Sequence, residues 1–142
     1  SDKKLVQSTD ARFKVYNAVS QVLLQKHQYK PLENYLLKTY KEFLRDKLFS
    51  KNNHDTLLQM LTYIVNSLYK NGKLKQSLEY AELLHKTMKE YDGMLYDKYI
   101  FYYYNSLVIN YSQLDKNKGI KLLEELNSNK KLEKNTFYKR FI

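Results

Sequence analysis

The chain has 142 residues, of which 43% are hydrophobic and 28% are charged, and its formal net charge at pH 7 is +10. A chain of this length fits one domain with a core of its own, here spanning residues 1–142. It contains no cysteine, which excludes disulfide frameworks, cysteine-based zinc sites and thiol catalysis. No apolar run approaches the roughly 20 residues of a membrane span. With three glycines and one proline, the sequence also has too few turn residues for an all-β fold.

The positive charge has two interpretations. A phosphate-binding surface or an acidic partner would use it, whereas a general enrichment in Lys, Asn and Tyr would produce it without a role. The lysines are spread along the whole chain and form no block of like charge. This spread favours the general enrichment.

Helical spacing dominates the sequence, because apolar residues recur at steps of three and four. The first predicted helix runs from about Asp10 to Lys26, and Thr9 or Asp10 can cap it. The second predicted helix runs from Pro31, which loses no hydrogen bond at a helix start, to about Phe49.

A polar link over residues 50–53 separates these two helices from the next two. Asp55 is the predicted cap of the third helix. Gly72 ends that helix, because glycine readily takes the left-handed conformation found there. The fourth helix follows at once and ends at a break over residues 91–93.

The C-terminal third of the chain predicts two more helices. The fifth, from about Leu95 to Gln113, is unusually aromatic, and a turn without glycine leads to the sixth, which ends near residues 127–129. Residues 130–142 predict a link and the start of a seventh helix. Because that helix would lack the polar outer face of a terminal repeat, we expect the chain to be a fragment of a longer protein.

The predicted helices pair into hairpins over about residues 10–49, 54–91 and 95–128. Their turns fall near residues 27, 72 and 114, so they recur after 45 and 42 residues. Self-similarity at such a period is typical of helical stacks, in which each hairpin buries its apolar face against the next.

The central hairpin resembles the tetratricopeptide repeat (TPR) family. Leu68 and Tyr69 stand where that family has an aromatic pair before its turn, and Gly72 takes the place of the turn glycine. Ser77 and Ala81 take the places of the small residues that let two helices approach closely. The resemblance implies an all-α fold, a right-handed stack of about three antiparallel helix hairpins (a TPR-like α-solenoid) plus a C-terminal helical segment.

The other two hairpins match this pattern at fewer positions. Asn110 and Tyr111 precede the third turn, and Gly119 takes the place of the small residue. In the first hairpin Leu24 and Leu32 take the corresponding places. The period exceeds the family's usual repeat of about 34 residues, so elongated repeats are expected.

In TPR arrays the first helices of the hairpins line a concave groove, and the resemblance implies the same here. Asn and Gln would bond a peptide backbone, tyrosines would give rigid contact area and lysines would meet carboxylates. The alternative is that the polar residues form a solvated face and that the tyrosines pack between hairpins. The position of each residue within its repeat predicts which ones line this groove: Lys14, Asn17, Gln21, Gln59, Thr62, Asn66, Tyr69, Lys70, Tyr104 and Tyr111, with Phe101 and Val108 beside the last two.

Other kinds of site are weakly indicated. The tyrosine run at 102–104 could stack on nucleic-acid bases, but consecutive helical residues point about 100° apart, so burial of some of them is favoured. His27, His54 and His85 lack metal-ligand spacing. No phosphate-binding glycine loop or nucleophile elbow is present. We therefore predict no catalytic residue, metal or cofactor.

The sequence thus predicts a cytoplasmic scaffold module that binds a protein or peptide and is not an enzyme, as the regulatory part of a larger intracellular protein. The alternative is a basic helical-repeat module that binds the RNA or DNA backbone, and its binding would depend strongly on salt. The exposed ends of the stack could also pair two copies of the chain as a homodimer.

Overall fold

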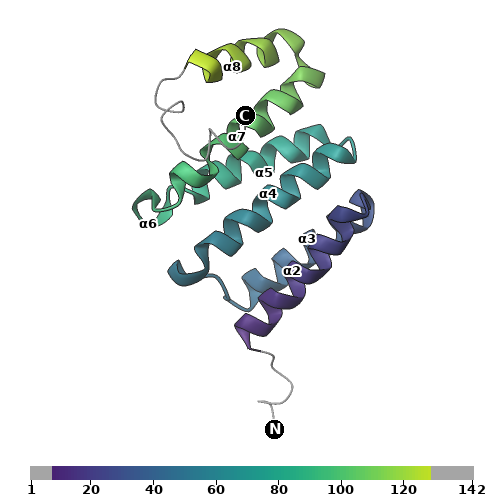
Figure 1. The fold of residues 1–142 in the computed structure, drawn as a ribbon, viewed down its shortest axis with the longest axis vertical. Helices are drawn as coiled ribbons and strands as arrows, with labels where there is room; N and C mark the ends of the chain where they lie inside the picture. The colour runs from purple at the N-terminus through teal and green to yellow at the C-terminus, as the bar shows by residue number, and fades with distance from the viewer. Residues whose placement is uncertain (1–7, 129–142) are drawn as a thin grey trace.

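The computed structural model describes residues 8–128, and these residues form helices and turns without a strand. The predicted all-α class is therefore confirmed. Figure 1 shows the elements, which in chain order are α2 (Thr9–Gln25), α3 (Tyr29–Arg45), the 3-10 turn η1 (Lys51–Asn53), α4 (His54–Lys70), α5 (Leu74–Thr87), the short α6 (Glu90–Gly93), α7 (Tyr96–Leu114) and α8 (Lys116–Ser128).

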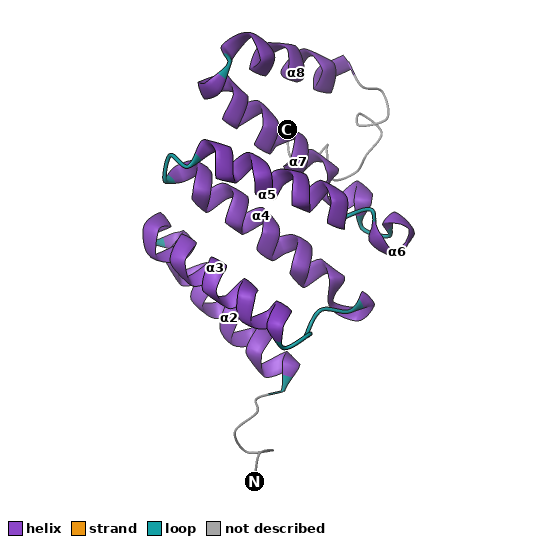
Figure 2. Ribbon diagram, turned by 180° about the vertical axis from the view of Figure 1, so that it is seen from behind, coloured by secondary structure: helices purple, strands orange, loops and turns teal. Residues whose placement is uncertain are grey.

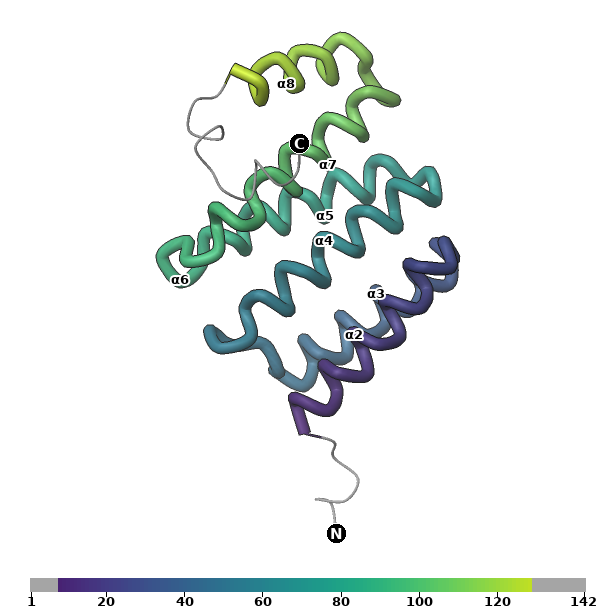
Figure 3. The backbone as a smooth tube through the Cα atoms, in the orientation of Figure 1, coloured from purple at the N-terminus to yellow at the C-terminus, as the bar shows by residue number. Residues whose placement is uncertain are grey.

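The long helices follow one another along the long axis of the molecule, and consecutive helices run antiparallel (Figures 1 and 2). Each long helix contacts the next one in the sequence, and α4 also contacts α7. The backbone path in Figure 3 shows α6 as a short loop-like element between α5 and α7. Three hairpins result, α2 with α3, α4 with α5 and α7 with α8.

Two helix starts differ from the prediction. The cap of α2 is Ser8, whose Oγ accepts a hydrogen bond from the N–H of Ala11 at 3.1 Å, so Thr9 and Asp10 already belong to the helix. Asp55 lies one residue inside α4 rather than at its cap. The predicted cap residues lie one or two positions C-terminal to the residues that cap these helices.

The second helix is shifted toward the N-terminus relative to the prediction. It begins at Tyr29, and Pro31 lies within its first turn, where a missing N–H still costs nothing. It ends at Arg45 rather than near Phe49, because Lys47 adopts a left-handed φ of 53° that a helix cannot continue.

The turns that end α2, α3 and α4 share one hydrogen-bond pattern. In each, a residue with left-handed φ donates its N–H to the carbonyl three residues back, and the following N–H bonds the carbonyl five residues back. The left-handed residues are His27 (φ 54°), Lys47 (53°) and Gly72 (78°). The predicted glycine turn is confirmed, and the two other turns use residues that carry no such signal in the sequence.

Small residues lie where the two helices of a hairpin approach each other closely. Ser77 and Ala81 are fully buried on α5, and the Ser77 Oγ donates to the carbonyl of Val65 at 2.9 Å. Gly119 is buried on α8, where an added Cβ would lie 2.8 Å from the backbone nitrogen of Ser112. The predicted small-residue positions are therefore positions of close backbone approach.

Polar contacts fix the outer hairpins on the central one. The Glu33 carboxylate, 4% exposed, accepts hydrogen bonds from Lys73 Nζ at 2.6 Å and Asn71 Nδ2 at 2.9 Å, which ties α3 to the turn after α4. The Tyr99 hydroxyl donates to the Asp55 carboxylate at 2.8 Å, which ties α7 to the start of α4, and burial raises the Tyr99 pKa above its ordinary value. These contacts hold α3 and α7 against the central hairpin.

Within residues 8–128, no helix is both long enough and apolar enough to cross a membrane. The predicted C-terminal link and seventh helix fall on residues 130–142, outside the described part of the chain.

Candidate functional site

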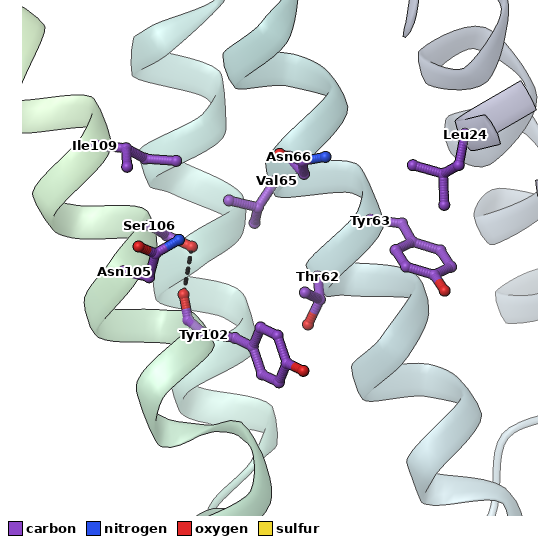
Figure 4. Close-up of a pocket in the computed structure, with 9 residues that line it drawn as sticks. All are labelled: Leu24, Thr62, Tyr63, Val65, Asn66, Tyr102, Asn105, Ser106 and Ile109. Carbon is purple, nitrogen blue, oxygen red and sulfur yellow. Dashed lines mark hydrogen bonds between the residues drawn. The ribbon is translucent and has the colours of Figure 1, made fainter. Parts of the chain in front are cut away.

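A groove runs across three helices that belong to three different hairpins, α2, α4 and α7 (Figure 4). Its volume is about 260 Å³. Nine residues line it and define what we call the groove: Leu24 from α2, Thr62, Tyr63, Val65 and Asn66 from α4, and Tyr102, Asn105, Ser106 and Ile109 from α7.

The middle of the groove is formed by α4. Thr62 and Asn66 are one helical turn apart and present their side chains on the same face. Val65, 2% exposed, forms part of the lining at the base of this face. The Thr62 hydroxyl donates to the carbonyl of Leu58 at 2.8 Å, so it turns its methyl group rather than a free hydroxyl donor to the groove.

One wall comes from α7, through residues spaced by three and four along a single face. Tyr102 is 41% exposed, and Figure 4 shows its ring pointing toward Thr62 across the groove. The Ser106 hydroxyl donates to the carbonyl of Tyr102 at 2.7 Å. Asn105 and Ile109 complete the face. This wall therefore offers one aromatic ring, one aliphatic side chain and one amide.

The opposite wall combines Leu24 of α2 with Tyr63 of α4. The Gln21 Nε2 donates to the Tyr63 hydroxyl at 2.7 Å, between two helices of different hairpins. This bond fixes the orientation of the Tyr63 ring, so the wall is set before any ligand arrives.

None of the nine lining residues carries a charge, although 28% of the chain is charged. The groups whose pKa values are shifted lie elsewhere. Burial raises the pKa values of Tyr16 and Tyr103 and lowers those of His54 and His85, and none of these four residues lines the groove. The groove therefore presents uncharged rings, aliphatic groups and amides.

The structure brings part of the predicted site together at the groove. Thr62 and Asn66 line it, and Gln21 supports it through Tyr63. Gln59 lies one turn earlier on α4 and does not line it. Lys14 and Asn17 are exposed on α2, also away from the lining.

Two predicted residues at the end of α4 make contacts of their own. The Tyr69 hydroxyl accepts a hydrogen bond from Gln113 Nε2 at 3.0 Å, which links α4 to α7. Lys70 is exposed and places its Nζ 5.6 Å from the centre of the Tyr29 ring. Both contacts join neighbouring hairpins rather than line the groove.

On α7 the structure places the predicted residues away from the groove. Tyr104 and Tyr111 are each about half a helical turn from the face that Tyr102 and Ile109 present. Tyr111 instead packs under Lys118 of α8, whose Nζ lies 4.1 Å from the ring centre. Phe101 is 1% exposed, so it belongs to the core; Val108 does not line the groove either.

Sequence reasoning left seven of the nine lining residues out of the predicted groove: Leu24, Tyr63, Val65, Tyr102, Asn105, Ser106 and Ile109. The last four lie on α7, and their spacing of three and four is visible in the sequence. Aromatic residues occur on every side of this helix, so hydrophobicity could not identify which side faces the groove. The only usable signal was the pair of polar residues, Asn105 and Ser106, that interrupts the apolar run.

The tyrosine run does not form a stacking platform. Tyr102 lies in the groove, whereas Tyr103 is 7% exposed, stacks on His85 at 4.2 Å between ring centres and donates to Glu82 at 2.8 Å. The predicted burial of part of this run is confirmed. His54 is the first residue of α4 and is buried. Among residues 8–128, no three His, Cys, Asp or Glu side chains come together as a metal site.

No family model, no curated protein and no solved structure matches the chain. The resemblance of the central hairpin to the TPR family stays a prediction from its residues.

Proposed function

We propose that this chain is a scaffold module that binds a segment of another protein in the groove, and that it is built as a right-handed TPR-like stack of three hairpins. The single observation that carries the proposal is the lining itself. Three helices from three hairpins meet in one hollow that offers rings, aliphatic groups and amides but no charge. Such a module would serve as the regulatory part of a larger intracellular protein.

The composition of the groove fits a protein ligand. Aromatic residues are enriched in the buried centres of protein interfaces and charged residues are depleted there, as they are in this lining. The volume of about 260 Å³ lies below the roughly 300–1,000 Å³ of sites that enclose a small molecule. A hollow of this size takes one or two side chains of a longer segment.

The packing of the hairpins supports the stacked arrangement. The two helices of the second hairpin approach closely at Ser77 and those of the third at Gly119, and α4 contacts α7 directly. A stack of this kind puts the first helix of each hairpin on a common side, where a partner can contact several repeats at once.

A random-peptide library displayed on phage tests the proposal. Peptides that the wild-type protein enriches at moderate salt would be measured by fluorescence anisotropy against Ile109→Arg. A matched control is Val15→Arg, which also replaces an aliphatic side chain by arginine. Val15 is 50% exposed and lines a separate depression between α2 and α3. We expect Ile109→Arg to weaken binding at least about tenfold, because it puts a charge into the apolar groove, and Val15→Arg to bind like the wild type.

Failure to enrich any peptide, or equal binding of the enriched peptides to both variants, would overturn the groove as the binding site. Far-ultraviolet circular dichroism and thermal unfolding show whether each variant keeps its fold.

One observation favours the second candidate, binding of a nucleic-acid backbone. Lys30, Lys38 and Lys41 lie along one exposed face of α3, away from the groove. Lysines bind phosphates as mobile point charges, and such binding weakens steeply with salt. Binding of single-stranded RNA that falls steeply with salt, and that Ile109→Arg leaves unchanged, would support this candidate over the first.

A further inference from the structure

The three hairpin turns lie side by side on one edge of the stack (Figures 1 and 2). Neighbouring turns are also joined by hydrogen bonds. The Asn71 Nδ2 donates to the carbonyl of Tyr29 at 2.9 Å, and the Gln113 Nε2 donates to the Tyr69 hydroxyl at 3.0 Å. We call this continuous surface the turn edge, and it comprises residues 26–30, 70–75 and 113–118.

The turn edge concentrates positive charge. It holds seven exposed lysines and one acidic residue, Asp115. Lys73 Nζ is paired with the Glu33 carboxylate at 2.6 Å, whereas the other six form no ion pair within residues 8–128. These six unpaired lysines are Lys26, Lys30, Lys70, Lys75, Lys116 and Lys118. They are far apart in the sequence, and the stacking of the hairpins brings them to one edge.

The opposite edge of the stack is balanced in charge. Residues 8–12, 45–55 and 89–98 hold six basic and six acidic residues. Ion pairs join several of them, since Arg12 pairs with Asp46 at 2.8 Å and Lys98 pairs with Asp55 at 2.8 Å. The 17 residues of α4 separate the two edges by about 25 Å, more than twice the Debye length of about 10 Å at 0.1 M salt. An anionic partner at the turn edge is therefore screened from the opposite edge.

We infer that the turn edge docks on an anionic membrane surface, a contact separate from the proposed groove. Clusters of four to eight lysines attract the headgroups of anionic phospholipids, and the six unpaired lysines fall within this range. Lysine carries its charge on a long flexible stem, so lysines on protruding turns can reach a flat surface together. No pocket or fixed ligand geometry is needed for this kind of contact.

Other anionic partners fit the turn edge less well. Proteins that bind single-stranded nucleic acids use a positively charged groove and open aromatic faces on which bases stack. Here lysines cover the rings, with Lys70 Nζ 5.6 Å from the centre of the Tyr29 ring and Lys118 Nζ 4.1 Å from that of Tyr111. An acidic protein would need apolar anchors, because lysine is depleted from protein interfaces. Leu114 is the one large apolar side chain exposed on this edge.

Co-sedimentation with lipid vesicles tests the inference. The protein would be mixed with vesicles of phosphatidylcholine alone, or of phosphatidylcholine and phosphatidylserine in equal parts, each at low and at moderate salt. We expect binding only to the vesicles that contain phosphatidylserine, and weaker binding as salt rises. Soluble glycerophosphoserine should not displace the protein, because a single headgroup lacks the charge density of a surface.

Reversal of charge at the two edges locates the contact. Lys75→Glu/Lys116→Glu should weaken binding to the phosphatidylserine vesicles more than about twentyfold, since each lysine near such a surface contributes roughly fivefold. Both positions lie in the first turn of a helix, where an acidic side chain is favourable, so the fold should be kept. Lys75→Gln/Lys116→Gln, which removes the charges without reversing them, should give a smaller loss in the same direction.

The matched control is Lys51→Glu/Lys89→Glu, which makes the same change in net charge at exposed positions of the opposite edge. It should change binding less than about twofold, because these positions lie beyond the range of the surface field. Equal binding to both kinds of vesicle, or an equal loss in the two reversed pairs, would overturn the inference.

Single-stranded RNA is the competing ligand. If it bound more tightly than the phosphatidylserine vesicles at the same concentration of negative charge, and lost that binding in Lys75→Glu/Lys116→Glu, the turn edge would belong to nucleic acid and the inference would be wrong. Peptides bound in the groove should bind both reversed pairs as they bind the wild type, because none of the four lysines lines the groove. The membrane contact and the proposed function can therefore fail separately.

Discussion

Replacement of Gly119 by alanine tests how closely α7 and α8 pack. Gly119 lies within α8, so by helix propensity alone the change to alanine should stabilise the protein by about 1 kcal/mol. The structure opposes this gain. An alanine Cβ would lie 2.8 Å from the backbone nitrogen and 3.0 Å from the Cα of Ser112 on α7.

The steric cost of the added Cβ is larger than the gain in helix propensity. Contacts of this kind involve main-chain atoms, which cannot rotate away as the end of a flexible side chain can, so the two helices must separate. Overpacking of this sort costs about 1–3 kcal/mol. After the gain in propensity is subtracted, we expect a net loss of about 1 kcal/mol in the free energy of unfolding, which lowers Tm by roughly 3–6 °C in a chain of this size.

Urea unfolding followed by far-ultraviolet circular dichroism measures this difference. The control is Asn117→Ala, at an exposed position of the same helix, which should leave stability unchanged or raise it by about 0.5 kcal/mol. If Gly119→Ala also stabilised the protein, as a glycine on an open helix surface would, the close approach of α7 and α8 would be wrong.

Three further predictions concern two contacts between hairpins and one buried histidine. Lys73→Met leaves the buried Glu33 carboxylate with Asn71 as its hydrogen-bond partner, so the free energy of unfolding in urea should fall by about 1–2 kcal/mol. Adding Glu33→Gln should recover most of this loss, and a double variant without recovery would contradict the ion pair. Tyr99→Phe removes the hydroxyl that donates to Asp55 and should lower Tm by an amount matching about 1–2 kcal/mol, whereas an unchanged Tm would show that this bond does not form in solution. Burial lowers the pKa of His54 below 6.5, so the unfolded chain takes up the proton more readily and stability is complete above about pH 6.5 and declines as the pH falls. His54→Gln should therefore reduce the difference in unfolding free energy between about pH 7.5 and about pH 5.5. Part of this pH dependence should remain because burial also lowers the pKa of His85. An equal pH dependence in the variant and the wild type would count against a buried neutral His54.

The helices could be predicted because their buried faces repeat with the helical period. α4 buries Leu58, Leu61, Ile64, Val65 and Leu68, and this spacing is plain in the sequence. Their ends were less predictable. Ser8 and Lys47 set the limits of α2 and α3 through backbone geometry and a single side-chain hydrogen bond, and such local choices compete closely with alternatives one or two residues away.

The candidate site could be predicted in part on α4 but not on α7. On α4 a polar face stands opposite the apolar one, so Thr62 and Asn66 could be placed on the groove side. On α7 aromatic residues occupy every side, because neighbours on several sides cover this helix, α5 and α8 among them. Which tyrosine is exposed then depends on the positions of those neighbours, and the sequence of α7 alone does not contain them.

Because charge is separated from the groove, the two candidate functions would use different surfaces of the molecule. A surface that binds a polyanion gains its affinity by neutralising phosphates, so its cations must lie along the contact, as Lys30, Lys38 and Lys41 do on α3. The groove has no cation, so a polyanion would gain no phosphate neutralisation there. Salt therefore affects the two surfaces differently. Ligand binding that persists as salt rises belongs to the groove, and the net charge of +10 then acts on solubility and on encounter rates rather than on what the groove recognises.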